Sequence, residues 1–111
     1  MRFEESAVTN GLVIKALDQR ITADVAPEFK EALISFVTAG NRIIILDLSE
    51  VSFIDSSGLG ALIGSLKVIG EDGELLLSGA RESVVSMFKL TRMNKVFRMF
   101  KSVPEAVAAI A

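Results

Sequence analysis

The sequence predicts an α/β fold, in which a mixed sheet of four or five strands carries helices mainly on one side. Residues 43–46 are four consecutive apolar side chains and residues 75–77 are three leucines. Unbroken apolar runs of this length are typical of strands that are covered on both faces. Between these runs, residues 59–66 repeat leucine at helical spacing. Alternation of strands and helices favours a mainly parallel sheet with right-handed crossovers.

Composition limits the function more than the fold. The chain has 111 residues, half of them hydrophobic, so we expect a single domain over residues 1–111 with one sizeable core. Cysteine and histidine are absent, which removes disulfides, the usual zinc sites, and cysteine or Ser-His-Asp catalysis. We therefore expect no catalytic residue, no metal ligand and no cofactor. Without a long apolar run or a signal peptide, the protein is expected to be cytoplasmic, with no membrane partner.

The first third of the chain predicts a hairpin followed by a helix. Strands over residues 3–9 and 12–17 flank Asn10-Gly11, a pair that allows positive φ at both central positions of a tight turn. Residues 18–23 are a connection, after which Thr22 or Asp24 can cap a helix that Gly40 ends. Pro27 falls in the first turn, where proline costs no hydrogen bond. The apolar side of this helix comprises Val25, Phe29, Ala32, Leu33, Phe36 and Val37.

Residues 42–48 form the predicted central strand, and the helix after it begins at two serines. Ser56 or Ser57 lies where an N-cap oxygen would bind the free amides of the first turn. The strand order continues with a strand over residues 74–78, a helix over 82–90 and a short strand over 96–100. Ser102 and Glu105 make a capping box for a closing helix that ends at residue 110. The complete order is β-β-α-β-α-β-α-β-α.

Charge is unevenly distributed along the chain. Residues 1–80 hold six basic and twelve acidic side chains, whereas residues 81–111 hold six basic and two acidic ones. The two poles could face different partners. Nucleic acid is not an expected partner, because tryptophan and tyrosine, which stack on bases, are absent.

A helix N-terminus with two serines suits a phosphate, either as a ligand or attached to a serine. A purely structural interpretation is equally compatible with the residues, with Ser56 as a cap and the glycines allowing close packing. Gly60 and Gly64 lie one helical turn apart, and each costs about 1 kcal/mol relative to alanine inside a helix. They indicate a flat surface for another chain or, alternatively, contact with the first helix of this protein.

The motif Phe53-Ile54-Asp55-Ser56-Ser57-Gly58-Leu59-Gly60, with residues 47–49 before it and 62–64 after it, resembles the STAS-domain anti-sigma factor antagonists. The resemblance implies that a partner kinase of the GHKL type, which is also the anti-sigma factor, binds the unphosphorylated protein and phosphorylates Ser56. It also implies a metal-dependent serine phosphatase that resets Ser56. The residues expected to bind the partner are Thr22, Asp24, Asp55, Ser56, Ser57, Gly58, Gly60 and Gly64.

The chain departs from the family at one step. Family members commonly carry Gly-x-Leu-Asp after the second strand, and this chain has Gln19-Arg20-Ile21-Thr22. The client is therefore open, and a STAS regulatory subunit of a signalling enzyme or of a lipid-transport complex is the alternative. A nucleotide-binding module is another, although the serine-glycine loop lacks Gly-x-x-x-x-Gly-Lys-Ser/Thr and the next lysine is Lys67. A transporter tail or a stressosome subunit would need membrane spans or a further N-terminal domain.

Overall fold

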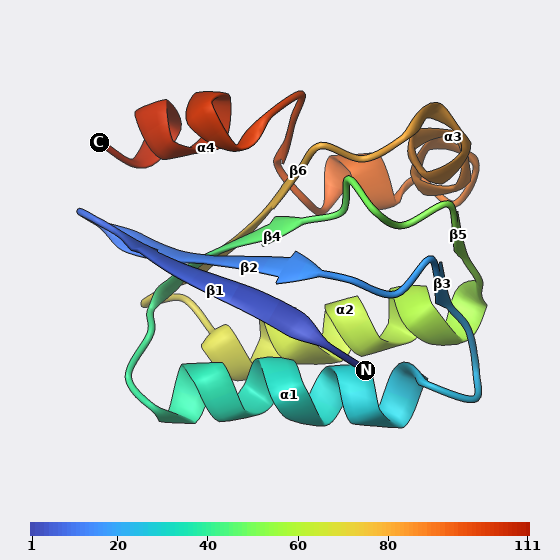
Figure 1. Ribbon diagram of the computed structural model, residues 1–111, viewed down its shortest axis with the longest axis horizontal. Helices are drawn as coiled ribbons and strands as arrows, with labels where there is room; N and C mark the ends of the chain where they lie inside the picture. Colours follow the sequence, from blue (N-terminus) through green and yellow to red (C-terminus); the bar gives the residue numbers. More distant parts are fainter.

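A computed structural model describes all residues, 1–111, as a mixed sheet with helices on both faces (Figure 1). The predicted α/β class and element order are confirmed, with two short strands and a 3-10 helix, η1, in addition. None of the helices has the length and apolar character that crossing a membrane requires. The elements are β1 (Phe3–Val8), β2 (Gly11–Ala16), β3 (Arg20–Ile21), α1 (Ala26–Thr38), β4 (Ile43–Asp47), β5 (Phe53–Ile54), α2 (Ser56–Ile69), β6 (Glu74–Ser78), α3 (Glu82–Leu90), η1 (Met93–Lys95), β7 (Met99–Phe100) and α4 (Val103–Ile110).

The main sheet has the strand order β1-β2-β4-β6-β7, so β4 is the central strand, as predicted. The pair β1–β2 is antiparallel and the other three pairs are parallel. Ile44, Ile45 and Leu46 of β4 are all buried, because both faces of this strand are covered. The carboxyl end of β4 therefore points toward the loop that leads to β5 and α2.

Helices α1 and α2 lie side by side under one face of the sheet, and α4 lies on the other face (Figure 1). The larger of two apolar clusters has 22 buried residues and includes side chains of α1, α2 and α3. The smaller one holds four buried residues and joins the sheet to Ala106 of α4. Three of the four helices thus pack into one core, in agreement with the predicted mainly one-sided arrangement.

The opening hairpin is present, but the predicted reason for its turn is wrong. Val8 pairs with Gly11, so the two-residue loop is Thr9–Asn10, and positive φ angles occur elsewhere in the chain. Gly11 is part of β2 instead. A Cβ atom at Gly11 would lie 2.9 Å from the carbonyl oxygen of Ile43. Glycine is needed at this position for the close approach of β4, and its freedom of φ is not used.

Helix α1 begins without the predicted cap. Its N-cap is Val25, which makes no side-chain hydrogen bond, and Pro27 lies in the first turn as expected. The carbonyl oxygen of Thr22 accepts the amides of Val25 at 3.0 Å and of Ala26 at 2.9 Å. The backbone of Thr22, and not its hydroxyl, therefore satisfies the start of the helix. At the other end Gly40 has a φ of 108°, as the prediction of a glycine stop requires.

Two short elements differ from the prediction because they are too short to show a period. The connection over residues 18–23 contains β3, which pairs in parallel with β5 as a separate two-stranded sheet. The last strand was predicted over residues 96–100 but is formed only by β7. The preceding residues turn through η1 because the buried ring of Phe97 packs edge-on against Phe88, with centroids 6.1 Å apart. Helix α4 is capped by Ser102, as predicted.

Candidate functional site

Helix α2 begins directly after β5, and the residue between them, Asp55, is its N-cap. The Asp55 backbone is extended, with φ −99° and ψ −176°, and its Oδ1 accepts the amide of Gly58 at 3.0 Å. The predicted serine cap is therefore wrong. Ser56 and Ser57 occupy the first two helical positions, because the aspartate before them already fills the capping position.

The second carboxylate oxygen of Asp55 reaches the loop before α1. Asp55 Oδ2 accepts the amide of Ala23 at 3.1 Å, and the Asp55 amide donates to the carbonyl oxygen of Ile21 at 3.2 Å. One side chain thus binds the start of α2 and the β3–α1 loop at the same time. The position of Ser56 relative to this loop follows from these bonds.

Ser56 and Ser57 both face solvent, and neither hydroxyl makes a hydrogen bond within the chain. Their backbone amides are also without an acceptor, whereas the next two amides of α2 donate to Asp55. Two free N–H donors and the positive end of the helix dipole remain beside the Ser56 hydroxyl. The helix start can therefore accommodate an anion on this side chain without losing its cap.

Thr22 and Asp24 lie in the adjacent loop and bind each other. The Thr22 hydroxyl donates to Asp24 Oδ1, and this bond is the main reason that the pKa of Asp24 lies below its ordinary value. The backbone amides of Asp24 and Val25 and the charge of Arg20 lower the pKa of Asp24 further. The predicted pair is therefore a local hydrogen-bonded unit at the edge of the site.

The three glycines of α2 have three different environments. A Cβ at Gly58 would lie 2.6 Å from the carbonyl oxygen of Ile21, so glycine is required there for contact with β3. At Gly64 it would meet the Lys30 side chain of α1 at 2.6 Å, whereas at Gly60 it would meet nothing within 4 Å. Of the two alternatives, contact with the first helix therefore applies to Gly64, and an open surface applies to Gly60.

A shallow groove runs between the first turns of α1 and α2 and has a volume of about 390 Å³. It brings Ser57 and Gly60 together with residues of α1 that the sequence did not assign to the site. The pattern of α1 shows which side is buried, but nothing in it tells which part of the polar side lies next to α2. The lining residues are Ala23, Ala26, Pro27, Lys30, Ser57, Gly60 and Ala61.

The pair Arg20 and Phe53 also lies at the site, and the sequence did not predict it. The β3–β5 pairing places the two residues opposite each other, and the Arg20 guanidinium lies 4.6 Å from the centre of the Phe53 ring. Phe53 is 39% exposed, although it is aromatic and three residues from Ser56. Arginine and aromatic side chains are enriched in protein interfaces. The only signal in the sequence was an aromatic residue at the start of the motif.

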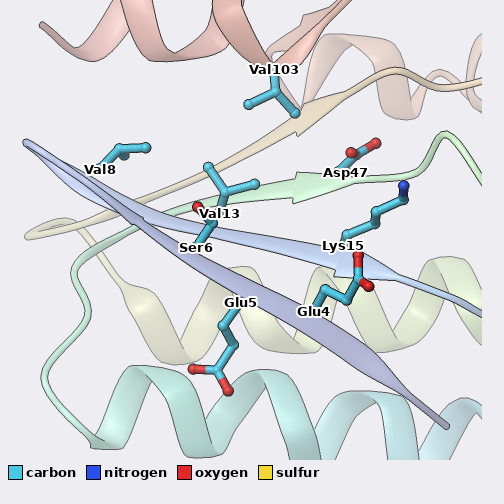
Figure 2. Close-up of a pocket in the computed structure, with 8 residues that line it drawn as sticks. All are labelled: Glu4, Glu5, Ser6, Val8, Val13, Lys15, Asp47 and Val103. Atoms are coloured by element: carbon cyan, nitrogen blue, oxygen red, sulfur yellow. The ribbon is translucent and has the colours of Figure 1, made fainter.

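The largest hollow in the molecule, about 590 Å³, is not at this site. Figure 2 shows it on the outer face of β1 and β2, beside α4, where none of the predicted site residues lies. Lys15 pairs in register with Glu4 on one side and with Asp47 on the other. The hollow is thus a strip of sheet that α4 leaves uncovered. Across neighbouring strands its charges alternate in sign, from Glu4 to Lys15 to Asp47.

Comparisons with known proteins agree with this arrangement. The STAS domain family matches residues 5–106. The anti-sigma-B factor antagonist of Listeria monocytogenes is 32% identical over 80 residues, which are 71% of this chain and 70% of that protein. An anti-sigma factor antagonist from Mycobacterium paratuberculosis superposes with a TM-score of 0.88 at 22% identity, over 98% of this chain and 92% of that one.

The fold of SpoIIAA, an anti-sigma factor antagonist, is also similar. Its unphosphorylated form superposes with a TM-score of 0.80 at 20% identity, over 98% of this chain and 96% of that one. The phosphorylated Bacillus SpoIIAA gives 0.72 at 19% identity, over 99% of this chain and 100% of that one. At these identities the solved structures show the shared fold. Membership of the family is shown by the STAS domain match and by the Listeria relative. The chain belongs to the STAS domain family, as the motif around Ser56 predicts.

Proposed function

We propose that this protein is an anti-sigma factor antagonist of a partner-switching pathway. In its unphosphorylated form it binds an anti-sigma factor, a serine kinase of the GHKL type, and phosphorylation of Ser56 releases it. A metal-dependent serine phosphatase resets the site. The protein is then a substrate and a binding partner, not a catalyst, and acts in the cytoplasm. Curated relatives with the name anti-sigma-B factor antagonist support the antagonist role.

The observation that carries the proposal is the exposed Ser56 hydroxyl beside a helix N-cap that is already occupied. Because Asp55 holds the start of α2 through Gly58 and Ala23, Ser56 makes no structural bond and is free for transfer of a phosphoryl group. SpoIIAA, which shares the fold, is known in a phosphorylated and an unphosphorylated form. This supports a reversible phosphorylation of the present chain, which we place at Ser56.

Phosphorylation would change binding more than folding. A phosphate adds a charge of about −1.5 to −2, which the helix terminus favours by roughly 0.3–1 kcal/mol. A partner surface that fits a neutral hydroxyl would instead lose several kcal/mol against a desolvated dianion, and each 1.4 kcal/mol is about a tenfold loss of affinity. The Asp55 carboxylate next to it adds a second negative charge. Release of the partner is therefore the expected outcome.

The partner surface that we propose extends from Ser56 in two directions. On one side lie Ser57, Gly60 and the groove against α1. On the other side lie Thr22 and Asp24 of the β3–α1 loop and the exposed pair Arg20 and Phe53. Gly58 and Gly64 support this surface from inside and are not part of it, since one packs on β3 and the other lies under Lys30.

The decisive experiment is a pull-down from the source cell with Ser56→Ala as bait, followed by incubation of the captured kinase with wild-type protein and ATP. We expect the captured kinase to modify Ser56 and to leave Ser57 unmodified. Phosphopeptide mapping distinguishes these serines. Modification of Ser57 alone, or of neither serine, would remove the assignment, and capture of a partner without kinase activity would favour another client.

A further inference from the structure

A third hollow lies between α3, η1 and β7, away from the Ser56 groove. It has a volume of about 320 Å³ and shares no lining residue with that groove. The seven lining residues come from the connection before α3, from α3 itself, from η1, and from β7 and the residue after it. They are Ala80, Val85, Lys89, Asn94, Met99, Phe100 and Lys101.

The hollow exists because the chain turns sharply after α3. Arg92 has a φ of 60°, a left-handed conformation that side chains other than glycine adopt at a cost, and η1 follows at once. Strand β7 is then only two residues long, so the segment between α3 and the sheet edge is a turn and not a continuous strand. This course leaves α3 on one side of the hollow and β7 on the other.

The walls of the hollow are mainly apolar and only partly buried. Ala80, Val85, Met99 and Phe100 all keep intermediate exposure, and all but Val85 also pack against one of the two apolar clusters. Removing such concave apolar surface from water is favourable. A ligand with an apolar body would therefore gain from entering, and the volume lies in the range of small-molecule pockets, about 300–1,000 Å³.

Two lysines at the hollow have no partner of opposite charge. The ion pairs of the chain join Met1 to Glu28, Arg81 to Glu50 and Arg98 to Glu74, so Lys89 and Lys101 take part in none of them. Glu105 approaches the second lysine only through its backbone, with Oε2 accepting the Lys101 amide at 3.3 Å. Both ammonium groups are exposed beside the apolar walls.

Arg98 also lies near this wall but, unlike the two lysines, it takes part in an ion pair. It lies 5.4 Å from the Phe100 ring centre, but its charge is already paired with Glu74 at 2.8 Å. The unbalanced positive charge at the hollow therefore comes from the two lysines. Neither lysine lines the groove beside Ser56.

From this combination we propose that the α3–β7 pocket binds a small organic anion with an apolar body, such as a medium-length monocarboxylate. The apolar part lies against Val85, Met99 and Phe100, and the anionic end lies between Lys89 and Lys101. An inorganic anion would gain the charge interaction without burial, and a neutral analogue would gain the burial without the charge. Binding of the combined ligand should exceed that of either.

The test uses the full chain and three probes, namely octanoate, octanamide and inorganic phosphate, with the methyl resonances followed by NMR. Octanoate should shift the methyl signals of Met99, Val85 and Ala80 in a saturable way, below its micelle-forming concentration. Octanamide should bind more weakly, and phosphate should leave these methyl signals in place. No saturable shift with octanoate, or equal binding of octanoate and octanamide, would overturn the proposal.

Charge variants test the role of the lysines without changing the core. Lys89→Gln and Lys101→Gln should each weaken octanoate binding by about two- to fivefold, as expected for an exposed ion pair, and the double variant should bind octanoate and octanamide alike. Lys95→Gln, in η1 but outside the lining, is the matched control and should bind as the wild type does. A double variant that keeps the preference for the anion would contradict the assignment.

Discussion

At the scale of single residues, Asp55 carries the structural role at the site. Its two carboxylate oxygens accept the amides of Gly58 and Ala23, so Asp55→Ala should lower the free energy of unfolding by about 1–3 kcal/mol, combining the loss of a cap and of a second bond. Urea denaturation measures this. Ser57→Ala is the control, and because its hydroxyl is exposed and unbonded, it should change the stability by less than about 0.5 kcal/mol.

Two glycines of α2 make a matched pair for a second prediction. Gly58→Ala should destabilise the fold by about 1–3 kcal/mol, because its Cβ would lie 2.6 Å from a backbone oxygen of β3 that cannot move alone. Gly60→Ala should instead stabilise it by up to about 1 kcal/mol, since the new methyl group meets nothing and alanine favours the helix. Thermal unfolding of both variants checks the opposite signs. Equal effects would contradict the packing described for Gly58.

Thr22 and Asp24 give a prediction about pH. The pKa of Asp24 is lowered first by the Thr22 hydroxyl, so Thr22→Val should raise it toward the ordinary value of 3.8. A group with a lowered folded pKa stabilises the fold above its unfolded pKa, and this contribution disappears as the pH falls through the folded pKa. The contribution is small because Asp24 is exposed. An NMR titration of the Asp24 carboxyl in both proteins measures the shift, and identical midpoints would refute the role of the hydroxyl.

At the scale of elements, the groove between α1 and α2 predicts which helix positions a partner contacts. Gly60→Leu would place a side chain in the open groove and should weaken partner binding with the fold intact. Gly64→Leu would only displace the flexible end of Lys30, so it should weaken binding much less. Affinity for the captured kinase, measured with thermal stability, separates the two. Equal losses would place the contact surface further along α2 than we propose.

The same scale shows why some elements could be predicted and others could not. The central β4 and the exact range of α3 followed from apolar runs and helical periodicity, which report burial directly. The strands β3 and β5 have two residues each, too few for any period, and their pairing is visible only in space. The start of α2 was predicted, but the cap was assigned to the wrong residue because aspartate and serine are almost equally good caps.

The site was predictable only where its residues are consecutive in the chain. The motif identified Ser56 and its neighbours because they are consecutive in the chain. Lys30 and Pro27 of α1 and Arg20 of β3 come from other segments, and only the helix packing and the β3–β5 pairing bring them to the site. Residues that act through tertiary proximity leave no local signal in a single sequence.

At the scale of the whole molecule, the proposed switch changes the surface and leaves the fold in place. All strands and helices are held by the two apolar clusters, and Ser56 belongs to neither. The charge of the phosphate is therefore felt at the partner surface and not in the core. Mimicry of the phosphate and stability of the fold should then be separable by mutation.

The last prediction tests this separation with Ser56→Asp and Ser56→Ala. The aspartate carries one negative charge where phosphate carries nearly two, so Ser56→Asp should weaken kinase binding measurably but incompletely, while Ser56→Ala should bind constitutively and resist release by ATP. The free energy of unfolding of both variants should lie within about 0.5 kcal/mol of the wild-type value. The Ser56 hydroxyl makes no hydrogen bond that could be lost, and an acidic side chain suits the first helical turn.

The salt dependence of binding distinguishes local charge repulsion from a conformational change. Since the loss of affinity in Ser56→Asp is attributed to repulsion at the surface, it should diminish as the ionic strength rises and screens the charge. Ser56→Asn, which is similar in shape and neutral, is the matched control and should keep most of the affinity. If Ser56→Asp unfolds the protein, or binds as tightly as Ser56→Ala at low salt, local repulsion is wrong and a conformational change must carry the signal.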